Sequence, residues 1–219
     1  MITLDEVKRN PLVEAYLTRA DEYLEVIGYT EHGRRHCGLV AKNARQILLD
    51  LGLPTREAEP CAIAAYLHDL GNVFNRVNHA FTGAILAHTL LLGMGMAPME
   101  ITQIVAAIGS HDEVSCEPVS NIASGLIIAD KSDVHRSRVR NPAMIKFDIH
   151  DRVNYAVESS TLLVNKDKRV IMLELALDTQ ISSLVEYFEI FLTRMLYCRK
   201  AANFLGCQFS LVANGNVLL

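Results

Sequence analysis

Apolar residues recur at helical spacing through about the first 150 residues of this 219-residue chain, and this pattern limits the fold more than any other feature. In 36-HCGLVAKNARQILLDLG-52, for example, Val40, Ala44 and Ile47 lie on one face, and Gly52 and Pro54 follow. The spacing predicts helices over 11–27, 36–52, 56–71 and 78–92, and two more that begin at Pro98 and after Ser120. A bundle of helices is therefore expected.

The pattern changes near residue 150. Segments 153–164 and 169–177 alternate between apolar and polar residues and flank the turn sequence at 165–168, which predicts an antiparallel hairpin. A long amphipathic helix is expected over 182–205, because its apolar residues return to helical spacing. The closing segment 207–212 is expected to form another strand.

These patterns predict a mainly α fold in two parts. Residues 1–150 are expected to form the helical bundle, and residues 151–219 a small α/β appendage of antiparallel strands and one long helix. We interpret the appendage as a part that serves homodimerisation or gates the substrate. Half of the residues are hydrophobic and 21% are charged, a balance typical of a folded domain with a sizeable core.

Composition also limits which binding partners and which cellular compartment are expected for the protein. The net charge of −4 provides no general attraction to nucleic acid polymers. No apolar run reaches the roughly 18 residues of a membrane span, so no membrane partner is expected. The five cysteines are scattered without a CxxC pair and are expected to be reduced, buried thiols. We therefore expect a soluble cytoplasmic protein.

Histidines and aspartates interrupt the apolar faces of the predicted helices near their ends. Each lies three or four residues from an inward apolar residue, and they are His36, His68, Asp69, His111 and Asp130. A single such histidine is more often a hydrogen-bonded core residue, but five coincident exceptions indicate a shared site. Buried carboxylates are costly unless they are paired or bind a cation. Imidazoles and carboxylates together suit iron, manganese, zinc or nickel.

The order of these residues resembles a known family. His36, the doublet His68-Asp69 and Asp130 follow the H…HD…D order of the HD-domain metal-dependent phosphohydrolases. The family's motifs are also similar to four segments of this chain, within about residues 30–140: AYLHDLGN, HAFTGA, IGSHDE and IIADKSD. The resemblance implies a helical fold in which these four residues bind one metal, with Asp69 placed to bridge to a second.

Further histidines mark the members of this family that bind two metals. The candidates are His79, His88 and His111. His79 and His88 are nine residues apart, on opposite sides of one helix, so they cannot both face the site. His79 matches the HxxxGA motif, and we interpret His88 as a core or surface residue. The resemblance thus implies two divalent ions and six ligands: His36, His68, Asp69, His79, His111 and Asp130.

Catalysis would use residues in and beside this ligand set. Metal ions activate water and polarise phosphoryl oxygens, and the developing charge needs donors nearby. The candidate catalytic residues are Asp69, Lys131 and His79. The chain's basic cluster, 131-KSDVHRSRVR-140, directly follows Asp130, and the candidate substrate-binding residues are Lys131, Arg136, Arg138 and Arg35. Arg138 is as well explained as a cation at a solvated helix end.

Two neighbouring positions leave alternatives open. Asn72 stands where the family commonly carries a lysine, and Lys131 or Arg76 are candidates to replace that lysine. Asp112 either orients an imidazole of the site or simply ends its helix.

The resemblance implies hydrolysis of a small phosphate ester or anhydride, with a nucleotide as the favoured substrate. A di-iron oxygenase of the same family would use the same six ligands with iron and O₂. In a non-enzymatic sensor or scaffold, the metal would only stabilise the structure, and the appendage would be the surface that binds partners. The basic cluster beside the ligands favours the hydrolase over both alternatives.

Overall fold

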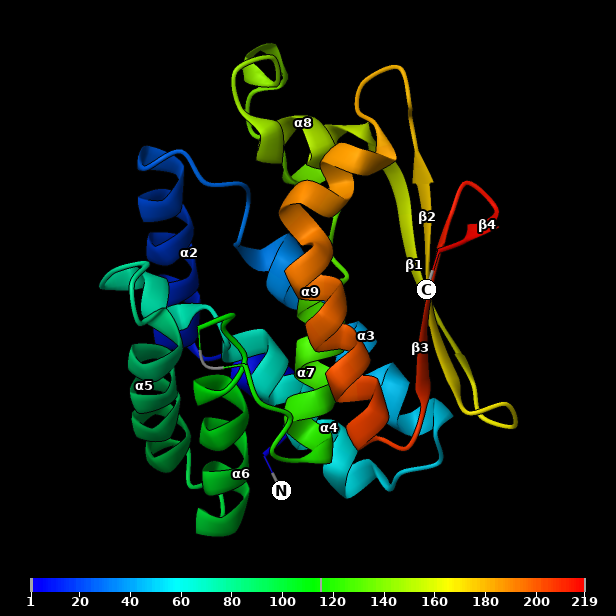
Figure 1. The fold of residues 1–219 in the computed structure, drawn as a ribbon. Helices are drawn as coiled ribbons and strands as arrows, with labels where there is room; N and C mark the ends of the chain where they lie inside the picture. Colours follow the sequence, from blue (N-terminus) through cyan, green and yellow to red (C-terminus); the bar gives the residue numbers. More distant parts are fainter. Residues whose placement is uncertain (1, 115, 219) are drawn as a thin grey trace.

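The computed structural model describes residues 2–114 and 116–218, and it confirms a mainly α fold with a small sheet (Figure 1). The helices of the first part are α1 (Leu4–Lys8), α2 (Pro11–Val26), α3 (Arg34–Asp50), α4 (Thr55–Leu67), the 3₁₀ helix η1 (Leu70–Val73), α5 (His79–Gly93), α6 (Pro98–Gly109) and α7 (Asn121–Lys131). The Ser120 hydroxyl accepts a hydrogen bond from Ala123 N and caps α7, as predicted.

Helix α4 lies at the centre of the bundle. Residues 60–72 are all buried, and α4 packs against α3, α6 and α7. Its alanines allow neighbouring helices to approach closely, and Gly125 of α7 leaves room for the Cys61 thiol. The helix was expected to continue to Gly71, but it ends at Leu67 and the chain tightens into η1. His68 and Asp69 therefore lie at the buried end of the central helix.

The second part contains more helix than expected. Two 3₁₀ helices, η2 (Arg136–Arg138) and η3 (Pro142–Met144), follow α7 within the first 150 residues. The elements after them are α8 (Ile149–Ala156), β1 (Val157–Asn165), β2 (Val170–Leu177), α9 (Leu184–Phe204), β3 (Gln208–Ala213) and β4 (Asn216–Val217). Residues 153–156, predicted as the start of a strand, form the last turn of α8. The Asp148 carboxylate caps this helix by accepting hydrogen bonds from the backbone of His150 and Asp151.

The strands form one sheet in the order β1-β2-β3-β4. The predicted hairpin of β1 and β2 is present and antiparallel, whereas β3 pairs with β2 in parallel. The parallel pairing requires a crossover, which α9 provides. Helix α9 packs against α7 on one side and β3 on the other (Figure 1).

Side chains from both parts share one hydrophobic cluster. Ile128 of α7 and Met195 of α9 both belong to it. The appendage therefore packs onto the bundle, and the division near residue 150 stays a prediction.

All five cysteines are buried and free. None of the helices in residues 2–114 and 116–218 has the length and apolar character that a bilayer-crossing helix needs.

Glycine at position 71 permits the contact between η1 and α5. A Cβ at Gly71 would overlap His79 O and lie 2.5 Å from Gly83 N, both backbone atoms of α5. We expect Gly71→Ala to destabilise the protein by about 3 kcal/mol, because backbone atoms cannot move aside as flexible side chains can. Chemical denaturation followed by circular dichroism measures this change.

The matched control is Gly38→Ala, within α3. A Cβ at Gly38 meets nothing within 4 Å, so alanine there should stabilise the helix by up to about 1 kcal/mol. Equal unfolding free energies for both variants would contradict the close approach of η1 to α5.

Candidate metal centre

The ends of five helices converge on one buried group of side chains. His36 lies in the first turn of α3, His68 and Asp69 follow α4, and Asp130 is near the end of α7. His79 begins α5, and His111 follows α6. The structure thus brings together all six side chains predicted as ligands, and only Asp130 is not fully buried.

Four of these residues form the first cluster, made of His36, His68, Asp69 and Asp130. Nε2 of His36 lies 3.3 Å from Nε2 of His68 and 3.4 Å from Oδ1 of Asp130. Nε2 of His68 lies 3.3 Å from Oδ2 of Asp69. Ligand atoms bound to one ion at about 2.0–2.2 Å lie roughly 3.0–3.5 Å from each other. The first cluster therefore has the spacing of a single metal site.

Asp69 also faces a second cluster, made of Asp69, His79 and His111. Its Oδ1 lies 3.4 Å from Nε2 of His79, which lies 3.2 Å from Nε2 of His111. Asn72 Nδ2 donates to the same Oδ1 at 2.8 Å, so the residue at the family's lysine position orients the carboxylate. The two oxygens of Asp69 thus point into different clusters, as a bridging ligand requires.

Every imidazole of the two clusters presents Nε2 because its Nδ1 is held by an acceptor. Nδ1 of His36 donates to Oδ2 of Asp133 at 2.6 Å. The others donate to the carbonyl three residues earlier, at 2.6–3.0 Å, in the pairs His68 with Ala65, His79 with Arg76 and His111 with Ile108. Such bonds fix the tautomer of metal-binding histidines. Nε2 atoms that lie this close need a proton or a metal ion between them, and a set of imidazoles and carboxylates fits divalent metal.

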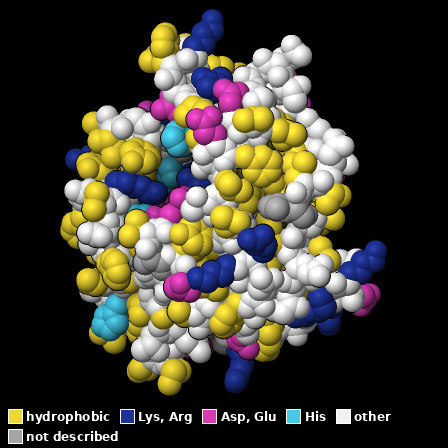
Figure 2. Space-filling model, viewed as in Figure 1, with side chains coloured by type: hydrophobic (Ala, Val, Ile, Leu, Met, Phe, Trp, Pro, Cys, Tyr) yellow, Lys and Arg dark blue, Asp and Glu magenta, His cyan; other side chains and the backbone are white. Residues whose placement is uncertain are grey.

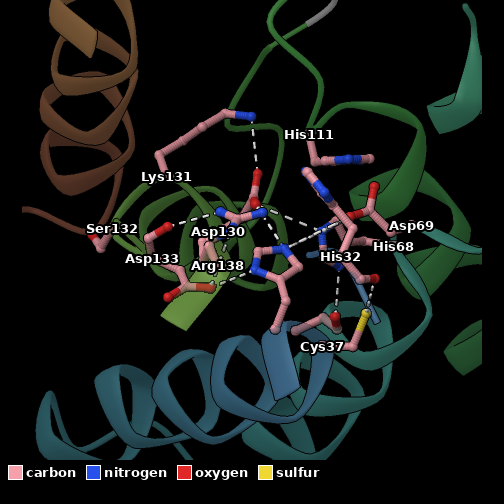
Figure 3. Close-up of polar contacts among 12 residues, drawn as sticks. His32, Cys37, His68, Asp69, His111, Asp130, Lys131, Ser132, Asp133 and Arg138 are labelled. Carbon is pink, nitrogen blue, oxygen red and sulfur yellow. Dashed lines mark hydrogen bonds and ion pairs between the residues drawn. The ribbon is translucent and has the colours of Figure 1, made fainter. Parts of the chain in front are cut away.

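Electrostatics within the first cluster also favour a cation. Burial lowers the pKa of His68, but the Asp69 and Asp130 carboxylates outweigh this effect and raise it to about 10. Burial raises the pKa of Asp69, yet His68 and its neighbours hold it well below the usual range. Burial and the charge of His68 hold the pKa of His111 well below its ordinary value. Positive charge is thus stabilised where the two carboxylates face His68 (Figure 3).

Lys131 is the basic-cluster residue that reaches the metal ligands directly. Its ammonium lies 2.9 Å from Oδ2 of Asp130 (Figure 3). Its side chain also lines the metal pocket, the cavity bounded by the predicted ligands Asp69, His79, His111 and Asp130 together with His32, Arg76, Asp112, Glu113, Lys131, Arg138 and Arg194. Burial lowers the pKa of Lys131, but Asp130 outweighs this effect and raises it, so the side chain remains a cation. Arg138 also lines the pocket, but its guanidinium donates to Glu31 O and Asp133 O and fixes the loop.

The other predicted substrate-binding residues lie elsewhere. Arg35 donates to Asp133 and Glu31, and so positions the carboxylate that holds His36. Arg136 pairs with Glu158 and does not line the metal pocket. His88 is exposed on α5, so of the two interpretations, a core or a surface residue, the structure supports the surface residue.

Several residues in the pocket or beside the ligands were not predicted as site residues from the sequence. Asp133 is part of the motif segment IIADKSD, but its hydrogen bond with His36 joins residues that are 97 positions apart in the sequence. His32 precedes α3 and lines the pocket, as does Arg194 of α9. Asp112, which the sequence left open as a residue that orients an imidazole or ends its helix, also lines the pocket, with Oδ1 3.9 Å from Nε2 of His79. No local pattern distinguishes His32 or Arg194, because helix packing alone brings them to the site.

Arg76 lies at the second cluster. Its Nη1 is 3.2 Å from Nε2 of His79 and 3.7 Å from Oδ1 of Asp69. The guanidinium therefore faces the same ligand atoms that a second ion would bind.

Figure 2 shows histidine side chains at the bottom of a hollow in the face of the molecule that is also seen in Figure 1, with basic and acidic side chains around its mouth.

The two clusters generate a prediction about metal content. We expect protein purified without chelator to contain two divalent ions per chain, measured by inductively coupled plasma mass spectrometry. His79→Ala removes a ligand of the second cluster only and should leave one ion. The control is His88→Ala, an exposed histidine of the same helix, which should keep two. Two ions retained in His79→Ala would contradict the second cluster.

A comparison with known families matches the segment that carries all six predicted ligands. The family described as HD domain matches residues 33–134. The uncharacterized protein MJ1020 of Methanocaldococcus jannaschii is 28% identical over 200 residues, which cover 80% of this chain and 76% of that protein. A crystal structure of a predicted HD superfamily hydrolase from an uncultured Thermotogales bacterium is 26% identical, with a TM-score of 0.45, over 61% of this chain and 75% of that one. Residues 33–134 therefore match the HD-domain family, as the order of His36, His68-Asp69 and Asp130 predicted.

Proposed function

We propose that the protein is a metal-dependent phosphohydrolase that cleaves a small phosphate ester or anhydride, with a nucleotide as the favoured substrate. The observation that carries this proposal is the pair of clusters sharing Asp69, with one oxygen facing each. The match of residues 33–134 to the HD-domain family supports a metal-dependent hydrolase. The two clusters that share Asp69 support two ions of iron, manganese, zinc or nickel.

The metal ligands would hold two ions close together. Such ions polarise a phosphoryl oxygen and lower the pKa of bound water. Asp69 sets the spacing of the two clusters, and Asn72 keeps its carboxylate in that orientation. Asp133 and the carbonyls behind the imidazoles keep each Nε2 directed inward. These residues therefore preorganise the site before a substrate arrives.

Cations of the chain surround the place where a phosphate would lie. Lys131, Arg76 and Arg194 all line the metal pocket. Lys131 remains charged beside Asp130, so it can stabilise negative charge that develops on phosphoryl oxygens. A structural metal site needs no such cations around it, and O₂ carries no charge for them to bind. The phosphohydrolase is therefore the function that these residues favour.

Phosphate release tests this proposal. We expect the metal-loaded protein to release phosphate from nucleotides or from 4-nitrophenyl phosphate. Lys131→Met should lower kcat roughly 100-fold, the typical effect of removing one donor to a transition-state oxyanion. The control is Lys200→Met, an exposed lysine of α9 that pairs with Glu117, which should keep wild-type activity.

Other outcomes would point to a different function. Absence of phosphate release with each of the four candidate metals would contradict the phosphohydrolase. Oxygen uptake by the iron-loaded protein, measured with an oxygen electrode, would instead support the oxygenase. Equal activity of Lys131→Met and wild type would remove Lys131 from the mechanism while leaving the metal site in place.

A further inference from the structure

A much larger cavity adjoins the metal pocket. The metal pocket has a volume of about 20 Å³, room for roughly one water molecule, whereas the neighbouring cavity has about 380 Å³. His32, Arg76, Arg138 and Arg194 line both of them. A substrate whose reacting phosphoryl group lies at the metal clusters must therefore extend into the larger space, which we call the adjoining cavity.

Arg194 of α9 presents its two terminal nitrogens where the two cavities meet. Its Nε donates to Oε1 of Glu113 at 2.9 Å, and the side chain is 25% exposed. Among the described residues, Nη1 and Nη2 have no hydrogen-bond partner, and the buried side-chain atoms without a partner do not include them. Both nitrogens are therefore accessible to a ligand.

A ring and a carboxylate hold the Arg194 guanidinium in this position. Its Cζ lies 4.6 Å from the centroid of the Phe191 ring, and Glu113 binds its Nε. The two Nη groups remain as a planar fork, the geometry that binds two oxygens of a phosphoryl group. A guanidinium that is already held loses little freedom when such a group binds.

Arg76 provides a second guanidinium with free N–H groups at the same place. Its Nη1 lies beside Asn72 and His79, whereas its Nε and Nη2 have no hydrogen-bond partner among the described residues. Arg76 thus reaches a metal ligand directly. None of the six ligands is a hydrogen-bond or ion-pair partner of Arg194. Arg194 is therefore placed to bind a group next to the one that the metals bind.

The charges of the adjoining cavity confine anion binding to this end. Asp148 and Asp151 also line the cavity, but neither lines the metal pocket, so an anion is repelled from the part farther from the metals. Burial lowers the pKa of Arg138, Asp133 partly offsets this effect, and the charge of Arg194 lowers the pKa further. Cations are therefore crowded at the end that the two cavities share.

We propose that Arg194 binds a second phosphoryl group of the substrate, adjacent to the one that reacts at the metal clusters. The substrate class is then a phosphoric anhydride, such as a nucleoside diphosphate or triphosphate, rather than a simple phosphate monoester. This inference rests on the proposed function for the place of the reacting phosphoryl group. Arg194 lies outside the matched residues 33–134, so the appendage would select the anhydride.

Binding of inert phosphonates tests this inference apart from catalysis. Methylenediphosphonate carries two phosphoryl groups, and ethylphosphonate carries one. Isothermal titration calorimetry in excess manganese keeps the metal clusters loaded in every variant. We expect Arg194→Met to weaken the binding of methylenediphosphonate roughly tenfold, because it removes charge-assisted hydrogen bonds, and to change that of ethylphosphonate by less than about twofold.

Two further variants separate binding from packing. Arg199→Met removes an exposed arginine of the same helix and should keep the wild-type ratio of the two affinities. Glu113→Gln removes the charge that holds Nε but leaves both Nη groups, so it should also keep this ratio. If Arg194 acted only by holding Glu113, Glu113→Gln would change the ratio as much as Arg194→Met does.

The outcomes distinguish this inference from the proposed function. Metal content and unfolding temperature verify that each variant is folded, and Arg194→Gln is the second variant if methionine is not tolerated. No binding of methylenediphosphonate to wild type, an equal loss for both ligands in the Arg194 variant, or an unchanged ratio there would overturn the inference. The expected ratios without phosphate release from any substrate would overturn only the proposed function. Phosphate release together with an unchanged ratio would overturn only the role of Arg194.

Discussion

The site depends on one buried carboxylate. Asp69 is 2% exposed, and its two oxygens face different sets of imidazoles. An ionised carboxylate at this depth is unfavourable without compensating charge. Its neighbours supply this charge in part, since the amide of Asn72 donates to one oxygen and His68 lies beside the other. Divalent metal is the remaining compensation that the donor set fits.

The packing of helix ends places these groups with little freedom. His68 and Asp69 end the buried central helix, and Gly71 then passes against the start of α5, where His79 lies. Three imidazoles bond the carbonyl three residues earlier, so the helix termini themselves orient the ligands. Local unfolding at any of these ends would therefore disturb both the bundle and the site.

The appendage contributes side chains as well as packing. Arg194 of α9 lines the metal pocket, where its Nε donates to Glu113 at 2.9 Å. Asn154 of α8 lines the adjoining cavity. The residues around a substrate would thus come from both sides of residue 150. An HD domain that carried a different appendage could keep the same ligands and bind a different leaving group.

The sequence by itself determined most of the helices and five of the inward His and Asp side chains, because helical periodicity is a local property. It also indicated the family through the order of His36, His68-Asp69 and Asp130. It did not determine the end of α4 or the presence of α8. Only the tertiary structure placed Asp133 behind His36, Arg76 beside His79, and Arg35 and Arg136 away from the pocket. Such contacts join residues distant along the chain or depend on the direction of long side chains. Periodicity carries no information about either, since both follow from how the helices pack.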